Sequence, residues 1–328
     1  MSIVRWGLVS TANINRRVIP AIRASKRAEL VAVGSRAAES AAAYAAEWGI
    51  PQAYGSYEEL LAAPDVDAVY ISLPNTMHAE WTIKALEAGK HVLCEKPFAI
   101  NLDEVDAMIA AAGRTGRILA EAFMYRHHPQ TKTVLDWVRS GKLGEIKLVR
   151  ALFSFMISGE ANIRLQPHLA GGSLWDVGIY PVSFAQAVMG GAPTHVSAFQ
   201  TIGKSGVDVF FNGSMKYANG GQAQIVSAFN MPFQTSAEVI GSAGRLYLNR
   251  PFVSLDQNRQ LIFEDESGRT EPIAVEPEYL YQGEIEDMNA AILDGATPYL
   301  TLAETRDHVK TLLALYQAAE TGNNISLA

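Results

Sequence analysis

The sequence predicts an α/β protein: a doubly wound parallel sheet, followed by a second region of strands and helices. Within residues 1–123, short apolar segments alternate with segments of helical pattern, which is typical of parallel strands joined by crossover helices. From residue 144 onward, strand-like runs follow one another with glycine or asparagine turns between them. We therefore predict two domains, residues 1–123 and residues 124–328.

Composition narrows the class of protein. The 328 residues are 48% hydrophobic and 19% charged, which suits a globular protein with material for two cores. The balance of 27 Lys+Arg against 34 Asp+Glu, a net charge of −7, argues against nucleic acid or an acidic membrane as a partner. A single cysteine, Cys94, excludes an intrachain disulfide and a cysteine-rich metal site. No signal peptide or membrane-length apolar run opens the sequence, so we expect a cytoplasmic protein.

A turn without glycine joins the first predicted strand (3–9) to the first predicted helix (16–24). Dinucleotide-binding folds carry G-x-G-x-x-G here, because a side chain would keep the backbone away from the pyrophosphate. Ser10, Ala12 and Asn15 stand where those glycines would be, so a plain strand-turn-helix explains the pattern nearly as well. The cofactor contacts expected from this turn are Ser10, Thr11, Ala12, Asn13 and Ile14.

The second predicted strand (30–34) ends in Ser35 and Arg36, and the first acid after it is Glu39. Enzymes that use NAD usually place an acid here, to accept hydrogen bonds from the adenosine ribose. A hydroxyl and a guanidinium are suited instead to a 2′-phosphate. We expect NADP(H) to be preferred, with NAD(H) possible; the alternative is a solvent-facing arginine at a turn.

The third predicted strand (68–73) is followed by Pro74-Asn75 and by a helix over residues 76–88. Ligands of parallel sheets bind beyond the carboxyl ends of the strands, so Leu73, Pro74, Asn75 and His78 are expected to contact a cofactor. For His78, an ordinary packing or capping role is an equal alternative.

The fourth predicted strand (91–94) ends in Glu95-Lys96-Pro97, and Asn101 is a suitable N-cap for a helix that reaches residue 115. The same rule places Glu95, Lys96 and Pro97 beside the cofactor, with Lys96 able to meet a substrate. A surface lysine paired with Glu95 is the alternative. A fifth strand, residues 117–123, completes the first domain.

The sequence resembles the glucose-fructose oxidoreductase/inositol dehydrogenase family (Gfo/Idh/MocA) in Glu95-Lys96-Pro97, in Pro74-Asn75 with His78, and in residues 171–180 (GGSLWDVGIY). It is similar to the dihydrodiol and D-xylose dehydrogenase branch at residues 5–7, 53–60, 92–97, 121–126 and 162–165. The resemblance covers nearly the whole chain and departs from the family in the glycine-poor first turn.

The resemblance implies an N-terminal Rossmann domain and a C-terminal α+β domain with an open, largely antiparallel sheet. It also implies a homodimer, or a higher homo-oligomer, formed through that sheet. The sequence itself predicts strands at 144–158, 194–202, 208–217, 222–230 and 237–240, and helices at 172–189, 283–293 and 302–321.

The residues expected to carry the chemistry are Lys96, Tyr180 and Asp176. Asp176 and Tyr180 lie four apart on one predicted helix and therefore on one face; many family members have histidine where Tyr180 stands. Candidates for the substrate pocket are Tyr125, Arg126, Phe153, Asn162 and Arg164. His127 and His128 are adjacent, so their side chains diverge, and we predict no metal site.

These residues predict an NADP-dependent oxidoreductase that transfers a hydride between nicotinamide and a carbinol of a sugar, a polyol or a cyclic diol. Such an enzyme needs a group that accepts the hydroxyl proton. Tyr180 with Lys96 beside it, or Lys96 itself, would serve. Alternatives are an anhydro- or keto-sugar reductase of the same family and a cofactor-binding regulator without turnover.

Overall fold

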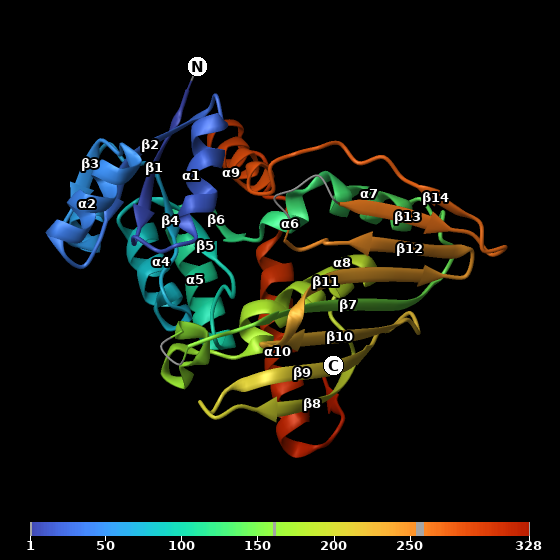
Figure 1. The fold of residues 1–328 in the computed structure, drawn as a ribbon. Helices are drawn as coiled ribbons and strands as arrows, with labels where there is room; N and C mark the ends of the chain where they lie inside the picture. Colours follow the sequence, from blue (N-terminus) through green and yellow to red (C-terminus); the bar gives the residue numbers. More distant parts are fainter. Residues whose placement is uncertain (1, 160–161, 254–258, 328) are drawn as a thin grey trace. The chain divides into compact units, whose positions relative to one another are not determined.

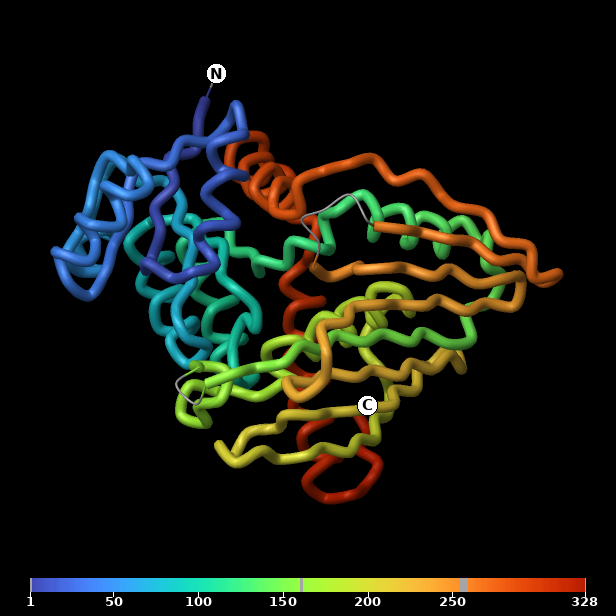
Figure 2. The backbone as a smooth tube through the Cα atoms, viewed as in Figure 1, coloured from blue at the N-terminus to red at the C-terminus, as the bar shows by residue number. Residues whose placement is uncertain are grey.

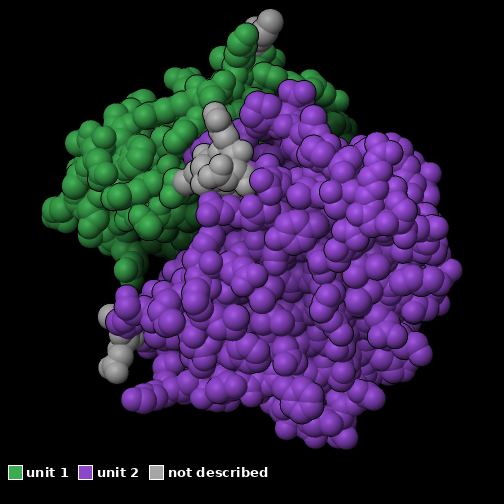
Figure 3. All heavy atoms as spheres, turned by 45° about the vertical axis from the view of Figure 1, so that its right-hand side comes forward, with its two compact units in different colours: residues 1–124, 281–306 green, residues 125–280, 307–328 purple. Residues whose placement is uncertain are grey.

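The computed structural model describes residues 2–159, 162–253 and 259–327. The chain divides into two compact units, which Figure 3 shows in different colours. The first unit contains residues 1–124 and 281–306, and the second contains residues 125–280 and 307–328. Within the described ranges, we find no helix that is both long and apolar enough to span a bilayer.

The first unit is built on a six-stranded parallel sheet with the strand order β3-β2-β1-β4-β5-β6 (Figure 1). This order confirms the predicted doubly wound sheet. Val9 of β1 pairs with Gly34 of β2 and with Ile71 of β4, so these strands end at one edge. The strands are β1 Val4–Val9, β2 Ala28–Gly34, β3 Gln52–Tyr54, β4 Ala68–Ile71, β5 His91–Glu95 and β6 Leu119–Ala122.

Helices connect these strands, and residues that commonly cap helices lie at several of their ends. As predicted, Asn101 caps its helix: its Oδ1 accepts a hydrogen bond from Glu104 N at 2.8 Å. Gly89 follows the C-terminal end of helix α4 (His78–Glu87) and has φ at 80°, a conformation that suits glycine. The helices are α1 Asn15–Ala24, α2 Ala38–Trp48, α3 Tyr57–Ala62, η1 Asn75–Met77, α4 His78–Glu87 and α5 Leu102–Thr115.

A late segment of the chain returns to the first unit. Helix α9 (Gln282–Asp294) lies beside α1, as the orange and blue tubes of Figure 2 show. Asn289 of α9 accepts a hydrogen bond from Trp6 Nε1 at 3.1 Å and donates one to Ser25 Oγ at 3.2 Å. Both partners are buried, so these bonds fasten α9 to the sheet and to the end of α1.

Two details of the first unit differ from the sequence prediction. Strand β3 was not predicted, because it has three residues, lies at the edge of the sheet and lacks an apolar run. The helix predicted over residues 76–88 is divided into η1 and α4, because the chain leaves Pro74 in a tighter turn before the α-helix begins.

The second unit is built on a nine-stranded sheet in the order β14-β13-β12-β11-β7-β10-β9-β8-β15 (Figure 1). Strand β10 runs parallel to β7, and the other neighbours run antiparallel, which confirms the expected largely antiparallel sheet. The strands are β7 Ile146–Met156, β8 His195–Ile202, β9 Asp208–Lys216, β10 Gln222–Ala228, β11 Asn230–Gly241, β12 Gly244–Asn249, β13 Gln260–Glu264, β14 Thr270–Pro272 and β15 Ile325–Ser326.

Helices lie against one face of this sheet (Figure 1). Helix α7 packs through Trp137 on Phe263 of β13, α8 packs on β7, and α10 packs through Tyr316 on Phe211 of β9. The helical segments after β6 are α6 Met124–His127, α7 Pro129–Arg139, η2 Ile163–Leu165, η3 Pro167–Leu169, η4 Leu174–Gly178, α8 Ile179–Met189 and α10 Leu302–Thr321. The helix predicted over residues 172–189 thus begins as a π-helix, η4, and continues as α8.

Candidate active site

A buried polar network shapes the turn after β1. Ser10 has φ at 114°, a conformation that favours glycine. Its Oγ lies 2.8 Å from Ser72 Oγ, and its carbonyl accepts a hydrogen bond from Asn15 Nδ2 at 2.8 Å. Ser72 Oγ in turn donates to Asn15 Oδ1 at 2.7 Å. Ser10 just after β1, Ser72 just after β4 and Asn15 at the start of α1 therefore hold a turn that glycines hold in other dinucleotide-binding folds.

The turn leads directly into α1. The backbone N–H groups of Asn15, Arg16 and Arg17 donate to Ala12 O, Asn13 O and Ile14 O at 3.1, 3.3 and 2.8 Å, so the first N–H groups of the helix already have partners. A hollow of about 290 Å³ lies beside the turn and is lined by Thr11, Asn13, Arg16, Ser40, Ala43, Tyr44 and Glu47. The predicted contacts Thr11 and Asn13 line this hollow, and Ser10 shapes the turn.

Ser35 and Arg36 lie next to the same turn. Ser10 N donates to Gly34 O at 3.2 Å, so the residues after β2 follow directly beside it. Ser35 is buried and Arg36 is exposed. Helix α2 starts two residues after Arg36, and among the described residues no side chain caps it at Ala37. A guanidinium, a hydroxyl and a helix N-terminus therefore occur together, which suits a phosphate group.

His78 ties the loop after β4 to the loop after β5. It is 1% exposed, and its ring nitrogens each lie 2.8 Å from a carbonyl oxygen, Nε2 from Leu73 and Nδ1 from Pro97. Burial lowers the pKa of His78 and outweighs the effect of the two carbonyls. The structure thus gives His78 a packing role that holds Leu73, Pro74 and Asn75 against Pro97; a contact with the cofactor stays a prediction.

Lys96 follows β5 directly, at the carboxyl edge of the parallel sheet, and is half-buried. Lys96 N donates to the Oε2 of Glu95 at 3.1 Å, and Tyr70 Oη donates to the Oε1 of Glu95. The backbone of the following loop is fixed by Glu121, whose Oε1 accepts from Phe98 N at 3.3 Å. Lys96 is therefore presented on a loop whose backbone is held by two carboxylates.

A buried carboxyl lies near Glu95 in this unit. Glu284 of α9 is 2% exposed. Burial raises the pKa of Glu284 well above its usual value, and the charge of Glu95 raises it further. Burial likewise raises the pKa of Glu95. The pair favours a partly protonated state, since two like charges repel each other strongly where little water surrounds them.

Replacing Glu284 with glutamine is expected to flatten the pH dependence of stability. A carboxyl whose pKa is raised in the folded state stabilises the fold below its unfolded pKa of about 4.3. This contribution is lost as the pH rises through the raised pKa, at about 1.4 kcal/mol for each pH unit between the two values. Urea unfolding at pH 5 and pH 8 measures the effect. The control is Glu286→Gln, because Glu286 lies on the same helix but is half-exposed. The expectation would be contradicted if the free energy of unfolding of Glu284→Gln changed between pH 5 and pH 8 as much as that of the wild type.

In the second unit, Tyr180 lies among aromatic side chains. It is 5% exposed on α8, and its ring centroid is 5.4 Å from that of Phe153, 5.7 Å from Tyr125 and 5.8 Å from Phe252. Tyr125 Oη donates to Ser183 Oγ at 2.9 Å. The structure therefore brings together three predicted residues, Tyr180, Phe153 and Tyr125, and fixes the ring of the tyrosine.

Asp176 belongs to a second cluster of predicted residues. Its Oδ2 accepts a hydrogen bond from Arg164 Nε at 2.6 Å. Asn162 Oδ1 accepts from Arg164 N at 3.1 Å and so starts η2. The Arg164 guanidinium carbon lies 6.0 Å from the ring centroid of Phe155. Arg126 is buried, and its Nη1 donates to Ser183 Oγ at 3.4 Å.

Each unit thus carries part of the predicted site. The predicted cofactor contacts and Lys96 belong to the first unit, and Tyr180, Asp176 and the predicted substrate residues belong to the second. Their joint action stays a prediction. Sequence reasoning missed Ser72, Tyr70 and Glu284; the one available signal was Asn15, a polar residue at a glycine position.

His127 and His128 are both buried in the second unit. His127 is buried, and burial lowers its pKa to about 3. His128 caps α7, because its Nδ1 accepts from Gln130 N at 3.1 Å. Across the described ranges, no cluster of three or more His, Cys, Asp or Glu side chains is placed to hold a metal ion. Cys94 is buried, and burial raises the pKa of its thiol.

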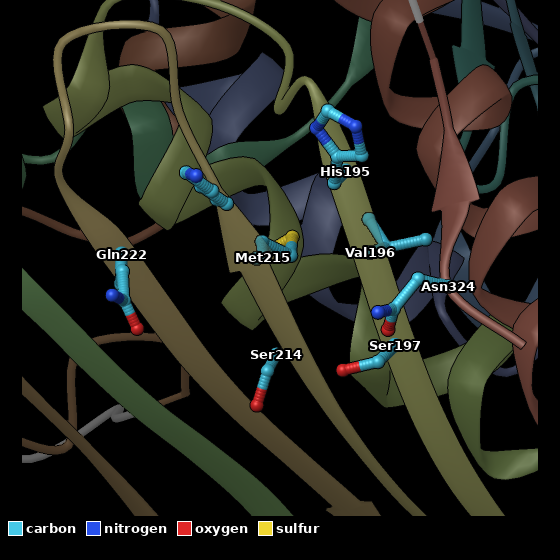
Figure 4. Close-up of a pocket in the computed structure, with 8 residues that line it drawn as sticks. His195, Val196, Ser197, Ser214, Met215, Gln222 and Asn324 are labelled. Atoms are coloured by element: carbon cyan, nitrogen blue, oxygen red, sulfur yellow. The ribbon is translucent and has the colours of Figure 1, made fainter.

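A groove of about 310 Å³ on the large sheet is separate from these clusters. His195, Val196, Ser197, Ser214, Met215, Lys216, Gln222 and Asn324 line it (Figure 4). None of the predicted site residues lines this groove. Its polar groups lie mainly on exposed strand positions, so it has the character of an open surface.

Comparisons with known proteins cover nearly the whole chain. The profile of the Gfo/Idh/MocA oxidoreductase family with an NAD-binding Rossmann fold matches residues 4–123, and that of the Gfo/Idh/MocA C-terminal domain matches residues 131–247. D-xylose 1-dehydrogenase (NADP(+)) 2 of Haloferax volcanii is 40% identical over 326 residues, 98% of this chain and 99% of the relative.

Two solved structures are similar over nearly their full length. KijD10, a 3-ketoreductase from Actinomadura kijaniata in complex with NADP and TDP-benzene, has a TM-score of 0.90 and 31% identity over 97% of this chain and 98% of its own. Aldose-aldose oxidoreductase from Caulobacter crescentus, complexed with glycerol, has a TM-score of 0.92 and 27% identity over 99% of this chain and 100% of its own.

Proposed function

Because the chain belongs to the Gfo/Idh/MocA family of oxidoreductases, we propose that it transfers a hydride between NADP(H) and a carbinol carbon of a sugar, a polyol or a cyclic diol. The observation that carries the proposal is the position of Lys96, directly after β5 at the ligand-binding edge of a Rossmann sheet. The substrate class is supported by the D-xylose dehydrogenase of Haloferax volcanii, which aligns with 98% of this chain.

The residues of the chain have separate tasks in this reaction. When bound, NADP⁺ would accept the hydride and NADPH would supply it. Lys96 donates a hydrogen bond to the reacting oxygen and supplies positive charge where negative charge develops. Tyr180 takes part in the transfer of the hydroxyl proton, and Asp176 orients the hydroxyl. Substrate contacts are assigned to Tyr125, Arg126, Phe153, Asn162 and Arg164.

The Arg164–Asp176 pair is consistent with an uncharged substrate. The guanidinium is already bonded to the carboxylate at 2.6 Å, so an acidic substrate would have to compete for it. Sugars and diols carry no acidic group, so they do not compete with Asp176 for the guanidinium. A carboxylate accepts several hydrogen bonds, so Asp176 can bind a substrate hydroxyl while it holds Arg164.

A substrate panel tests the proposal. NADPH fluorescence first establishes binding, and turnover is then measured with aldoses, polyols and cyclic diols plus NADP⁺. We expect oxidation of at least one of these classes. Binding without turnover on every compound, in either direction, would favour a regulator instead.

A second candidate is a keto-sugar reductase. It is favoured by the likeness to the 3-ketoreductase KijD10 at 31% identity. The same panel therefore includes keto- and anhydro-sugars with NADPH. Reduction of these compounds, with no oxidation of any alcohol, would favour this candidate.

We further propose that two copies pair through the face of the large sheet that the helices leave uncovered. Phe199 of β8 is 74% exposed and follows Ala198, which is buried toward the helices. On the same face, Arg245 of β12 pairs with Glu238 at 3.7 Å and with Glu264 at 2.8 Å. Sedimentation of the wild type should give the mass of a dimer, and Phe199→Glu should shift it toward the monomer; a monomeric wild type would contradict this.

A further inference from the structure

The helix that carries Asp176 and Tyr180 begins on a buried carboxylate. Asp208, the first residue of β9, is 2% exposed. Its Oδ2 accepts hydrogen bonds from Ser173 Oγ at 2.7 Å and from Leu174 N at 2.8 Å. Its Oδ1 accepts one from Tyr316 Oη at 2.8 Å. All of these residues belong to the second unit, and none was among the predicted site residues.

The loop before the helix is built to let this carboxylate approach. Gly172 has φ at 127°, which side chains rarely adopt. A Cβ on Gly172 would lie 2.2 Å from Asp208 Oδ1 and 2.9 Å from Tyr316 Oη. Only glycine therefore fits between the loop backbone and the two side chains that hold it.

The helix needs such an anchor because its first turn is irregular. Residues Leu174–Gly178 form the π-helix η4, and α8 with Tyr180 follows directly. A π-helical turn is rare and marginal on its own, and it changes the direction in which later side chains point. A carboxylate that binds both the first backbone N–H and the preceding side chain fixes where this turn starts.

Burial raises the pKa of Asp208, and the hydrogen bonds from Ser173, Tyr316 and Leu174 N oppose that rise by favouring the ionised carboxylate. Leu174 N–H is an obligatory donor. Burial and the charge of Asp208 raise the pKa of Tyr316 well above its usual value, so the phenol keeps its proton and donates. Ser173 Oγ also lies 3.0 Å from Ser227 Oγ, which connects the helix start to β10.

We propose that Asp208, held by Tyr316, is a positioning residue: it sets the start of the π-helical turn and thereby the positions of Asp176 and Tyr180. The inference rests on the proposed function for the part that Asp176 and Tyr180 play in turnover. It assigns no chemistry to Asp208 itself.

Asp208→Asn is the direct test. The amide keeps one acceptor oxygen, but its NH₂ replaces the other oxygen and cannot accept the hydrogen bond that Tyr316, Ser173 or Leu174 N donates there. We expect kcat to fall by up to about 10²-fold, as for a small misplacement of a reacting group, with the Kd of NADP(H) unchanged. Amide hydrogen exchange of residues 174–180 should become faster, while exchange in the first unit stays as in the wild type.

Tyr316→Phe provides a milder variant with a matched control. It removes one of the hydrogen bonds to Asp208 and should show the same changes to a smaller extent. Tyr217→Phe removes a phenol that is also buried in the second unit and whose hydroxyl lies 3.9 Å from Met215 Sδ. This control should leave both kcat and the exchange of residues 174–180 unchanged. If Asp208→Asn does not fold, Tyr316→Phe against Tyr217→Phe decides the matter.

Combining Asp208→Asn with Tyr180→Phe separates positioning from general loss of folded protein. If Asp208 acts through Tyr180, adding Asp208→Asn to Tyr180→Phe should lower kcat little beyond the loss caused by Tyr180→Phe alone. Unchanged exchange at residues 174–180 in Asp208→Asn would overturn the proposal, whereas a full kcat loss in both backgrounds would assign the effect on turnover to Asp176 rather than to Tyr180. If Tyr180→Phe alone turns over like the wild type, the role proposed for Tyr180 is wrong, whereas hydrogen exchange still decides whether Asp208 anchors the helix.

Discussion

Lys96→Ala is expected to lower kcat by about 10²- to 10⁴-fold, the range that general acid–base assistance contributes. In the proposed mechanism, the Lys96 side chain donates a hydrogen bond to the reacting oxygen and supplies the positive charge that stabilises it, and the substitution removes both. The backbone contact of Lys96 N with Glu95 Oε2, at 3.1 Å, does not depend on the side chain, so the loop should stay in place. Lys84→Ala, which removes an exposed lysine paired with Glu80, is the matched control.

Tyr180→Phe should lose kcat on the same scale, because it removes the phenol and keeps the aromatic packing on Phe153. If Lys96 and Tyr180 serve one proton transfer, the double variant should be little worse than the worse single variant. Single-turnover hydride transfer on an accepted alcohol measures each step. A near-normal rate in Tyr180→Phe would assign the proton to Lys96 alone, and a near-normal rate in Lys96→Ala would refute the mechanism.

The fold of the first unit could be predicted because its strands carry a simple signal. Parallel strands are buried on both faces and therefore appear as continuous apolar runs, as in residues 68–71. The predicted family and fold class are confirmed. Strand β12 was missed because it lies on an open sheet and carries exposed residues such as Arg245. The return of α9 to the first unit was also missed, since it depends on Asn289 meeting Trp6, 283 residues away.

The candidate site, like the fold, contains some residues that the sequence predicts and others that it does not. Residues at the ends of parallel strands, such as Arg36 and Lys96, could be placed from the sequence because the topology puts all carboxyl ends at one edge. The groups that fix those residues could not. Ser72 and Asn15 are 57 residues apart, and Asp208 and Leu174 are 34 apart. No local pattern contains such contacts, because they form only when the whole unit is folded.

Arg36→Ala is expected to weaken NADP(H) binding by about 10- to 10²-fold and to leave NAD(H) binding nearly unchanged. A hydrogen bond to a charged group contributes about 1.5–3 kcal/mol, and every 1.4 kcal/mol is about tenfold in Kd. Arg36 is exposed at the end of β2, beside the turn that begins at Ser10, so its side chain lies outside the core and its loss should not disturb the fold.

Dissociation constants for both cofactors, measured by fluorescence, decide whether Arg36 recognises the 2′-phosphate. Raising the salt concentration should reduce the preference of the wild type for NADP(H), because the interaction is between exposed charges. Arg114→Ala, which removes an exposed arginine paired with Glu87 at 3.2 Å, controls for the change in net charge. An equal loss of affinity for both cofactors in Arg36→Ala would mean that this side chain contacts a part the two cofactors share, and NADP(H) preference would then have to come from the hollow lined by Thr11, Arg16 and Ser40.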